Sequence, residues 1–209
     1  MAPRRLSTAV FDFGGVLVDW DPRHLYRKLI SESAEMELFL ATVTTREWHQ
    51  AQDHGGDPIE ATRRLQALHP GRDALIAAFY DRFDEMNEHA FPAMVSLVER
   101  LHAAGTRLLL VSNAPGFLDP WFRGPARRMH PFLGLFCDYV VSGLVGCSKP
   151  DPAIYELACR TGGFEPAEAV FIDDIDANVE GARAIGMAAI LHRSAAQTAA
   201  ELRALGLLT

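Results

Sequence analysis

The stretch Thr8-Ala9-Val10-Phe11-Asp12-Phe13-Gly14-Gly15 sets one carboxylate inside a run of apolar residues and closes that run with two glycines. A short apolar run closed by glycine is typical of a buried strand, which we predict over Thr8–Phe13. A carboxylate inside such a run is costly unless it has a charged or hydrogen-bonding partner. Asp12 is therefore a candidate functional residue at the carboxyl end of a buried strand.

Four later segments have the same character, and helical patterns lie between and after them. Runs rich in Val, Ile, Leu or Phe predict strands at Arg107–Ser112, Asp138–Ser142, Ala169–Asp173 and Met187–Leu191. Helical spacing of apolar residues is found at Met94–Leu101, Ile154–Ala158, Asn178–Ile185 and Ser194–Ala204. Strands that alternate with helices form a parallel sheet with helices on both faces. The sequence therefore predicts an α/β fold with a doubly wound parallel sheet.

The first two predicted strands do not follow this alternation. More than ninety residues separate them, and these residues carry little strand signal. Apolar stripes and capping patterns predict helices there, at Leu25–Ile30, at Met36–Val43, after Asp57-Pro58 and after Asp73. Clusters of proline and polar residues at Val18–Pro22 and Asn87–Pro92 are candidate hinges. We therefore predict an all-helical cap over residues 19–89, inserted into a core made of residues 1–18 and 90–209.

Polar residues gather where the predicted strands end. Asp12 ends the first strand, Ser112 and Asn113 the second, and Asp173 and Asp174 the fourth, while Lys149 follows the third. Ligands of open parallel sheets bind at the carboxyl ends of the strands, so these groups should share one rim. Clustered carboxylates repel one another unless a cation neutralises them, and oxygen ligands without His or Cys favour Mg²⁺. Mg²⁺ with a lysine and hydroxyl donors is a phosphate-binding arrangement, in which an aspartate can attack phosphorus.

Four ordered motifs resemble those of the haloacid dehalogenase-like superfamily. They are Phe11-Asp12-Phe13-Gly14-Gly15-Val16-Leu17, Val111-Ser112-Asn113, Ser148-Lys149-Pro150-Asp151-Pro152 and Phe171-Ile172-Asp173-Asp174-Ile175-Asp176-Ala177-Asn178. The fourth motif is similar to that of the α-glucose-1-phosphate phosphatase-like branch and of the N-terminal phosphatase domain of soluble epoxide hydrolases. The resemblance implies a Rossmann-like catalytic core with a helical cap. It also implies a Mg²⁺-dependent phosphatase of a small phosphorylated metabolite, with sugar phosphates among the candidates.

The resemblance implies a role for each residue that would meet the phosphoryl group. Asp12 would be the nucleophile and would form an aspartyl-phosphate. Ser112 would hydrogen-bond the phosphoryl oxygens, with Asn113 nearby. Lys149 would balance the charge on the nucleophile and on the transferring group.

A metal site is implied in the same way. Mg²⁺ would be held by the Asp12 carboxylate, the Gly14 carbonyl oxygen and the Asp174 carboxylate. Asp173 would support the metal shell or its waters. Asn178 stands where many relatives have another acid, and it would lie behind the metal ligands.

Gly14 is the departure from the family pattern that matters most. Most phosphatases of this family have a second aspartate at this position, which serves as general acid toward the leaving oxygen. General acid–base help is typically worth about 10²–10⁴-fold in rate. The glycine therefore implies either a substrate with a good leaving group, such as an anomeric phosphate, or another acid. Asp19, Asp21 and His24, just past the motif, are the candidates for that acid.

Two other functions remain open at the level of the sequence. A 2-haloacid dehalogenase would use Asp12 on carbon without a metal, and relatives of that kind also lack the second acid. They typically carry small polar residues where this chain has Asp173 and Asp174, so the acidic pair favours phosphoryl chemistry. A catalytically weak member, kept for binding or regulation, is the third possibility, and the intact Asp12, Ser112, Lys149 and Asp174 argue against it.

Composition limits the classes of binding partner that we expect for this chain. The chain has 209 residues with 27 acidic and 20 basic side chains, a formal charge of −7 that gives no support for nucleic-acid binding. No apolar run is long enough to span a membrane, and three cysteines without metal-ligand spacing fit a reducing compartment. We therefore expect a cytoplasmic protein with a small-molecule substrate and no nucleic-acid or membrane partner, as a monomer or weak homodimer.

Overall fold

Five parallel strands form the sheet at the centre of this computed structural model, which describes residues 6–208. The strands are β1 (Thr8–Phe11), β2 (Arg107–Ser112), β3 (Asp138–Val141), β4 (Ala169–Asp173) and β5 (Ala188–Leu191). Their order in the sheet is β3-β2-β1-β4-β5, and every neighbouring pair is parallel. Because β1 lies at the centre, successive connections run outward to both sides from it. The predicted doubly wound α/β fold is confirmed, while residues 1–5, where the predicted core begins, lie outside the described part of the chain.

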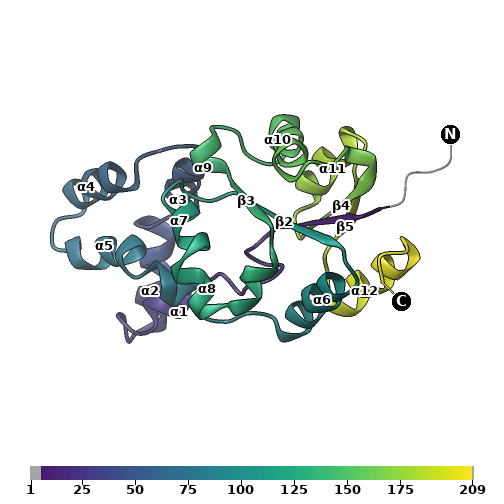
Figure 1. Cartoon of the computed structure of the whole chain (residues 1–209). Helices are drawn as coiled ribbons and strands as arrows, with labels where there is room; N and C mark the ends of the chain where they lie inside the picture. The colour runs from purple at the N-terminus through teal and green to yellow at the C-terminus, as the bar shows by residue number, and fades with distance from the viewer. Residues whose placement is uncertain (1–5, 209) are drawn as a thin grey trace.

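Helices cover both faces of the sheet (Figure 1). On one face lie α6 (Pro92–Ala103) and α12 (Ala195–Ala204), and on the other lie α10 (Pro152–Gly162) and α11 (Asp176–Ala184). Every residue of β1 and of β4 is buried, as is expected for strands covered on both sides. Among residues 6–208, every helix is too short or too polar to cross a bilayer.

Element boundaries differ from the predicted ones by a few residues. β1 ends at Phe11 rather than at Phe13, because the chain turns away at Gly14 and Gly15, and Gly15 has a positive φ of 79° that favours glycine. The predicted helix at Asn178–Ile185 begins two residues earlier, as α11. Three short helices that the sequence analysis did not predict join β2 to β3: α7 (Leu118–Arg123), α8 (Pro125–Met129) and the 3₁₀ helix η2 (Pro131–Leu135). Two more short elements flank α10: α9 (Ser142–Val145) and η3 (Pro166–Glu168).

Residues 19–89, which we call the cap, contain helices joined by short turns and lie beyond one end of the sheet (Figure 1). The cap contains α1 (Pro22–Tyr26), α2 (Ser33–Thr42), α3 (Arg46–Asp53), α4 (Pro58–Leu68), α5 (Asp73–Asp81) and η1 (Phe83–Met86). As predicted, Asp57 caps α4, where its carboxylate accepts hydrogen bonds from the Ile59 and Glu60 amides. The segments that enter and leave the cap run side by side, and the Asp19 amide donates to the His89 carbonyl at 2.7 Å.

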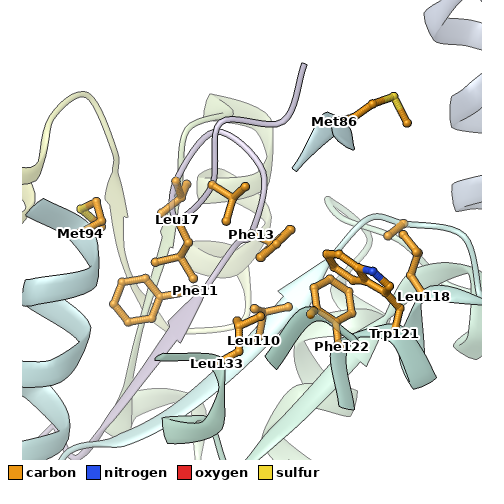
Figure 2. Close-up of a cluster of buried hydrophobic side chains, with 14 of the residues drawn as sticks. Phe11, Phe13, Leu17, Met86, Met94, Leu110, Leu118, Trp121, Phe122 and Leu133 are labelled. Carbon is orange, nitrogen blue, oxygen red and sulfur yellow. The ribbon is translucent and has the colours of Figure 1, made fainter. Parts of the chain in front are cut away.

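A single apolar cluster joins the sheet to the cap. Figure 2 shows Phe11 and Leu110 from the sheet beside Phe122 of α7 and, further out, Met86 of the cap. Phe13 packs edge-on against Phe122, with ring centroids 4.9 Å apart and planes at 89°. The residues flanking Asp12 on both sides are therefore buried in this cluster, which holds the backbone of Asp12 in place.

The cluster predicts which truncations destabilise the fold. Leu110→Ala, at a fully buried position in β2, should lower the free energy of unfolding by about 2–5 kcal/mol, because a cavity replaces packed atoms. Leu38→Ala in α2 is the matched control, since 58% of Leu38 is exposed, and should change the free energy by less than about 0.5 kcal/mol. Urea unfolding of both variants measures the difference. Equal losses would contradict the location of the core.

Candidate active site

A buried lysine lies between two carboxylates at the end of the sheet. Lys149 Nζ is 2.7 Å from Asp12 Oδ1 and 2.7 Å from Asp173 Oδ2, and only 4% of Lys149 is exposed. Burial alone would lower the pKa of Lys149, but the two carboxylates outweigh it and raise that pKa. The lysine is therefore a fixed positive charge at the nucleophile expected from the sequence.

Asn113 holds the loop that carries this lysine. Its side-chain amide donates to the Lys149 carbonyl at 2.9 Å, and its side-chain oxygen accepts from the Lys149 amide at 2.9 Å. Both polar atoms of the Asn113 side chain are thus used in positioning Lys149. The expected contact of Asn113 with phosphate stays a prediction. Ser112 ends β2 and lines the same cavity.

Asp173 and Asp174 are neighbours in sequence but have different surroundings. Asp173 is fully buried, and its oxygens accept from Lys149 Nζ, from the Asn178 amide at 3.0 and 3.1 Å, and from the Ile175 backbone amide at 2.8 Å. Asp174 is half-buried and lines the cavity instead. Asp173 is therefore held by donors within the protein, whereas Asp174 faces the cavity in which a ligand would bind.

The donor set fits Mg²⁺. One carboxylate oxygen each from Asp12, Asp173 and Asp174 lies within 4.8 Å of the others, and no His or Cys belongs to the cluster. Burial raises the pKa of Asp12, Asp173 adds to this and Lys149 opposes it; burial and Asp173 also raise the pKa of Asp174. A bound cation would reverse both shifts, because it favours the charged carboxylates.

Gly15 leaves the space that this cluster needs. A Cβ at Gly15 would stand 2.6 Å from Asp174 Oδ2, which is closer than real Cβ contacts. The glycine therefore gives the Asp174 carboxylate its place beside the nucleophile loop.

A cavity of about 270 Å³ opens above these groups and is closed on its other side by the cap. Of the residues predicted for the site, all but Asp173 line it: Asp12, Gly14, Ser112, Asn113, Lys149, Asp174 and Asn178. The apolar part of the wall includes Trp20 and Phe83 from the cap and Phe122 from α7. The cavity can therefore take a small molecule with one anionic end and one apolar or neutral end.

Comparison with known proteins assigns the chain to a family. The family model for haloacid dehalogenase-like hydrolases matches residues 6–186. The chain belongs to this family. The sesquiterpene phosphatase astK of Aspergillus oryzae is 29% identical over 201 residues, which cover 95% of this chain and 96% of that protein.

Two further comparisons agree with this assignment. The D-ribitol-5-phosphate phosphatase of Bacteroides thetaiotaomicron is 25% identical over 211 residues, 94% of this chain and 97% of that one. A haloacid dehalogenase-like enzyme of the same bacterium, solved as a magnesium complex, has a TM-score of 0.70 at 18% identity, covering 91% and 94% of the two chains. Solved dehalogenases share this fold as well.

The cap of this haloacid dehalogenase-like hydrolase contributes residues that the sequence analysis missed. Arg46, His49, Gln50 and Asp53 all line the cavity from α3. Their spacing of three, four and seven residues puts them on one face of a helix, and that spacing is the signal in the sequence. It was missed because α3 has few apolar residues and no apolar stripe to predict it.

The three residues proposed from the sequence as substitutes for the missing acid do not line the cavity. Asp19 Oδ2 pairs with His24 Nε2 at 3.0 Å. Asp21 caps α1, where its carboxylate accepts from the Arg23 amide at 2.9 Å. Each of the three thus has a structural partner at the entrance to the cap, and none of them is part of the cavity wall.

Asp53 is the titratable cap residue closest in character to the missing acid. It is 6% exposed, and its Oδ1 finds no hydrogen-bond partner among residues 6–208. Burial, together with repulsion from Asp12, raises the pKa of Asp53 to about 7, against a weaker opposing effect of Lys149. His49 Nε2 lies 3.7 Å from Asp53 Oδ1, and burial lowers the pKa of His49 to about 4, so the imidazole is neutral at pH 7.

The raised pKa of Asp53 predicts a pH-dependent stability. The folded protein holds a proton on Asp53 up to about pH 7, whereas an unfolded aspartate loses it near pH 4, so stability falls as pH rises through this window. Asp53→Asn has no proton to lose at this position. The difference in free energy of unfolding between Asp53→Asn and wild type should therefore rise by about 2 kcal/mol, in favour of the variant, from pH 5 to pH 8. Urea unfolding at both pH values measures the gain, and Asp81→Asn on the cap surface is the control. A gain equal to that of the control would place the pKa of Asp53 in the ordinary range.

A substitution at Gly15 should abolish metal binding although it changes no metal ligand. In Gly15→Ala, the new methyl group displaces the Asp174 carboxylate, so Mg²⁺ should no longer raise the melting temperature. Gly105→Ala is the matched control, because Gly105 has nearly the same φ (80° against 79°) and nothing within 4 Å of a Cβ. Both variants carry the same backbone strain, but only the control should keep the Mg²⁺ effect. A Mg²⁺ effect retained in Gly15→Ala would argue against Asp174 as a ligand.

Proposed function

We propose that this chain is a Mg²⁺-dependent phosphatase that hydrolyses a small phosphorylated metabolite through an aspartyl-phosphate on Asp12. One observation carries the proposal: Asp12 lies at the base of the cavity with one oxygen fixed by Lys149 at 2.7 Å and by the Phe13 amide at 2.7 Å. Its carboxylate is thus held in one orientation, as a nucleophile requires. Asp174 and Ser112 line the same cavity, where Asp174 can hold the metal ion and the Ser112 hydroxyl can donate to a phosphoryl oxygen.

The mechanism follows from what each side chain can do. An oxygen of Asp12 attacks phosphorus in line with the leaving oxygen, and water then hydrolyses the aspartyl-phosphate at phosphorus. Lys149 and the Ser112 hydroxyl stabilise the negative charge of the transferring group. Mg²⁺, held by Asp12 and Asp174 with the Gly14 carbonyl, would supply further neutralisation of that charge. Asp173 and Asn178 keep Lys149 in place, and the cap excludes water from the cavity.

The shape of the cavity supports a small organic phosphate as substrate. A volume of about 270 Å³ is at the low end of ligand sites, and its wall mixes aromatic side chains with polar ones. The two relatives named above act on a sesquiterpene and on D-ribitol 5-phosphate, by their names. We therefore infer a phosphate ester of a polyol, a sugar or a short isoprenoid, in which the organic part contacts the cap.

We prefer a phosphatase to a 2-haloacid dehalogenase because of the acidic pair Asp173 and Asp174. Asp174 adds a second ionisable carboxylate to the cavity that already holds Asp12, and Asp173 lies directly behind. A reaction of Asp12 on carbon would gain nothing from this charge, whereas Mg²⁺ and a phosphoryl group use it. A protein kept only for binding would have no use for the fixed geometry of Lys149 and Asp12.

Phosphate release from a panel of esters tests the proposal. The panel holds hexose 1-phosphates, hexose 6-phosphates, a pentitol phosphate, an isoprenyl phosphate and 4-nitrophenyl phosphate, each with Mg²⁺ and with chelator. We expect release that needs Mg²⁺ and that Asp12→Asn abolishes, because the nucleophile is gone, while Asp81→Asn on the cap surface leaves it unchanged.

The opposite results are equally concrete. Halide release from a 2-haloacid without Mg²⁺, and no phosphate release, would replace the proposal by a dehalogenase. Neither release, in a folded protein whose melting temperature does not respond to Mg²⁺, would indicate a binding protein.

A further inference from the structure

The position that usually carries a general acid leaves little room for a side chain in this fold. Gly14 has no side chain, and a Cβ there would stand 3.3 Å from the Cβ of Trp20. Trp20 in turn stacks on His49 of α3, with ring centroids 5.2 Å apart and planes at 18°. The cap therefore occupies the space beside Gly14, and the cap side of the cavity is where another acid can take over the role of the missing one.

Asp53 is built into that side of the cavity. Its carboxyl is more than nine-tenths buried, lines the cavity together with Asp12 and Lys149, and has an unpartnered oxygen. The Ser142 hydroxyl of the core donates to the Asp53 carbonyl at 2.5 Å. Gly143 lets the backbone of the cap approach, since a Cβ there would be 3.0 Å from the Gln52 carbonyl oxygen. The end of α3 is thus fixed to the core, beside α9, as Figure 1 shows.

We propose that Asp53 is the general acid of the reaction and stands in for the side chain that Gly14 lacks. The inference rests on the proposed phosphatase activity. When Asp12 attacks phosphorus, the bond from phosphorus to the leaving oxygen breaks, and the Asp53 proton moves to that oxygen to give the free alcohol. In the second step, the Asp53 carboxylate takes a proton from the attacking water. The bond from phosphorus to Asp12 then breaks, phosphate leaves, and Asp53 is protonated again.

The groups around Asp53 suit it to both steps. His49 and Tyr80 face it from the cap, with His49 Nδ1 3.2 Å from the Tyr80 hydroxyl, and Asp12 and Lys149 act on it from the core. If the Tyr80 hydroxyl donates to Nδ1, the proton of His49 is on Nε2, toward Asp53 Oδ1. With a pKa of about 7, Asp53 holds a proton in part at neutral pH and can give it up and regain it.

Other groups of the cavity wall are less suited to this role. Burial lowers the pKa of His49 to about 4, so its imidazole has no proton to spare at pH 7. The Arg46 side chain is a guanidinium and the Gln50 side chain is an amide, and neither group serves as a general acid. His54 is exposed to solvent at the end of α3. Of these cap residues, Asp53 alone combines burial, an acidic proton and a free oxygen.

Leaving groups of different acidity separate a general acid from a structural residue. We compare 4-nitrophenyl phosphate, whose phenolate leaves without a proton, with an alkyl phosphate that the panel identifies as a substrate. The rate constant for phosphoryl transfer to Asp12 is measured in a rapid-quench experiment under single-turnover conditions. In Asp53→Asn it should fall about 10²–10⁴-fold for the alkyl phosphate and change less than about threefold for the aryl phosphate. With the aryl phosphate, the aspartyl-phosphate should accumulate in Asp53→Asn, because it forms at the normal rate but the base for its hydrolysis is missing.

The outcomes are distinguishable. Equal loss on both substrates, or no loss on either, in a folded Asp53→Asn protein would overturn the role of Asp53 and leave the phosphatase intact. No phosphate release by the wild type would overturn both proposals. Asp81→Asn is the matched control on the cap surface, and its transfer rates should equal those of the wild type with both substrates.

The wild-type pH profile gives a test that does not depend on the variant. Above pH 7 the transfer rate should fall with the alkyl phosphate, as Asp53 loses its proton, and stay constant with the aryl phosphate. Parallel profiles for the two substrates would contradict the proposal.

Discussion

The ion pairs of Lys149 with Asp12 and Asp173 are the constraint on which the site depends. Three charged groups are buried at the meeting point of β1, β4 and the loop after β3, where each charge is tolerable only because the others are present. Removing one partner from such a buried set typically costs about 3–5 kcal/mol. Asp12 lies more than a hundred residues before Lys149 and Asp173 in the sequence, and the doubly wound topology brings the three together. The fold and the proposed chemistry therefore both depend on Lys149.

Much of the core could be predicted from the sequence, because its signals are local. Apolar runs such as Ala169–Asp173 indicate buried strands by composition alone, and the rule that parallel strands end on one edge collects their terminal polar residues. Asp12, Ser112, Lys149 and Asp174 were found in this way, and the structure brings them to one cavity. The exact strand ends were less predictable. The regular strand β1 stops at Phe11, although the backbone amide of Asp12 still donates to the Ile172 carbonyl of β4.

The cap side of the site could not be predicted in the same way, because it depends on long-range packing. α3 has few apolar residues, so no apolar stripe marks its buried face, and no local motif separates Asp53 from an exposed cap residue such as Asp81. What makes Asp53 unusual is its position against the core, set by Ser142 some ninety residues later. Asp19 and Asp21 were the nearer candidates in sequence, but their carboxylates are used by His24 and by the first turn of α1.

A division of labour between core and cap follows from this geometry. The groups proposed to meet the phosphoryl oxygens lie at strand ends or in the loop before α10, and the sheet and the apolar cluster around Phe11 and Phe13 hold the nucleophile in place. The groups proposed to face the rest of the substrate come from α3, whose last turn contacts the core. With the proposed acid Asp53 on the cap rather than at Gly14, protonation of the leaving oxygen would require the cap to lie against the core. The step that expels water from the cavity would then also assemble the proton donor, so a substrate that does not let the cap close would meet the nucleophile without the acid.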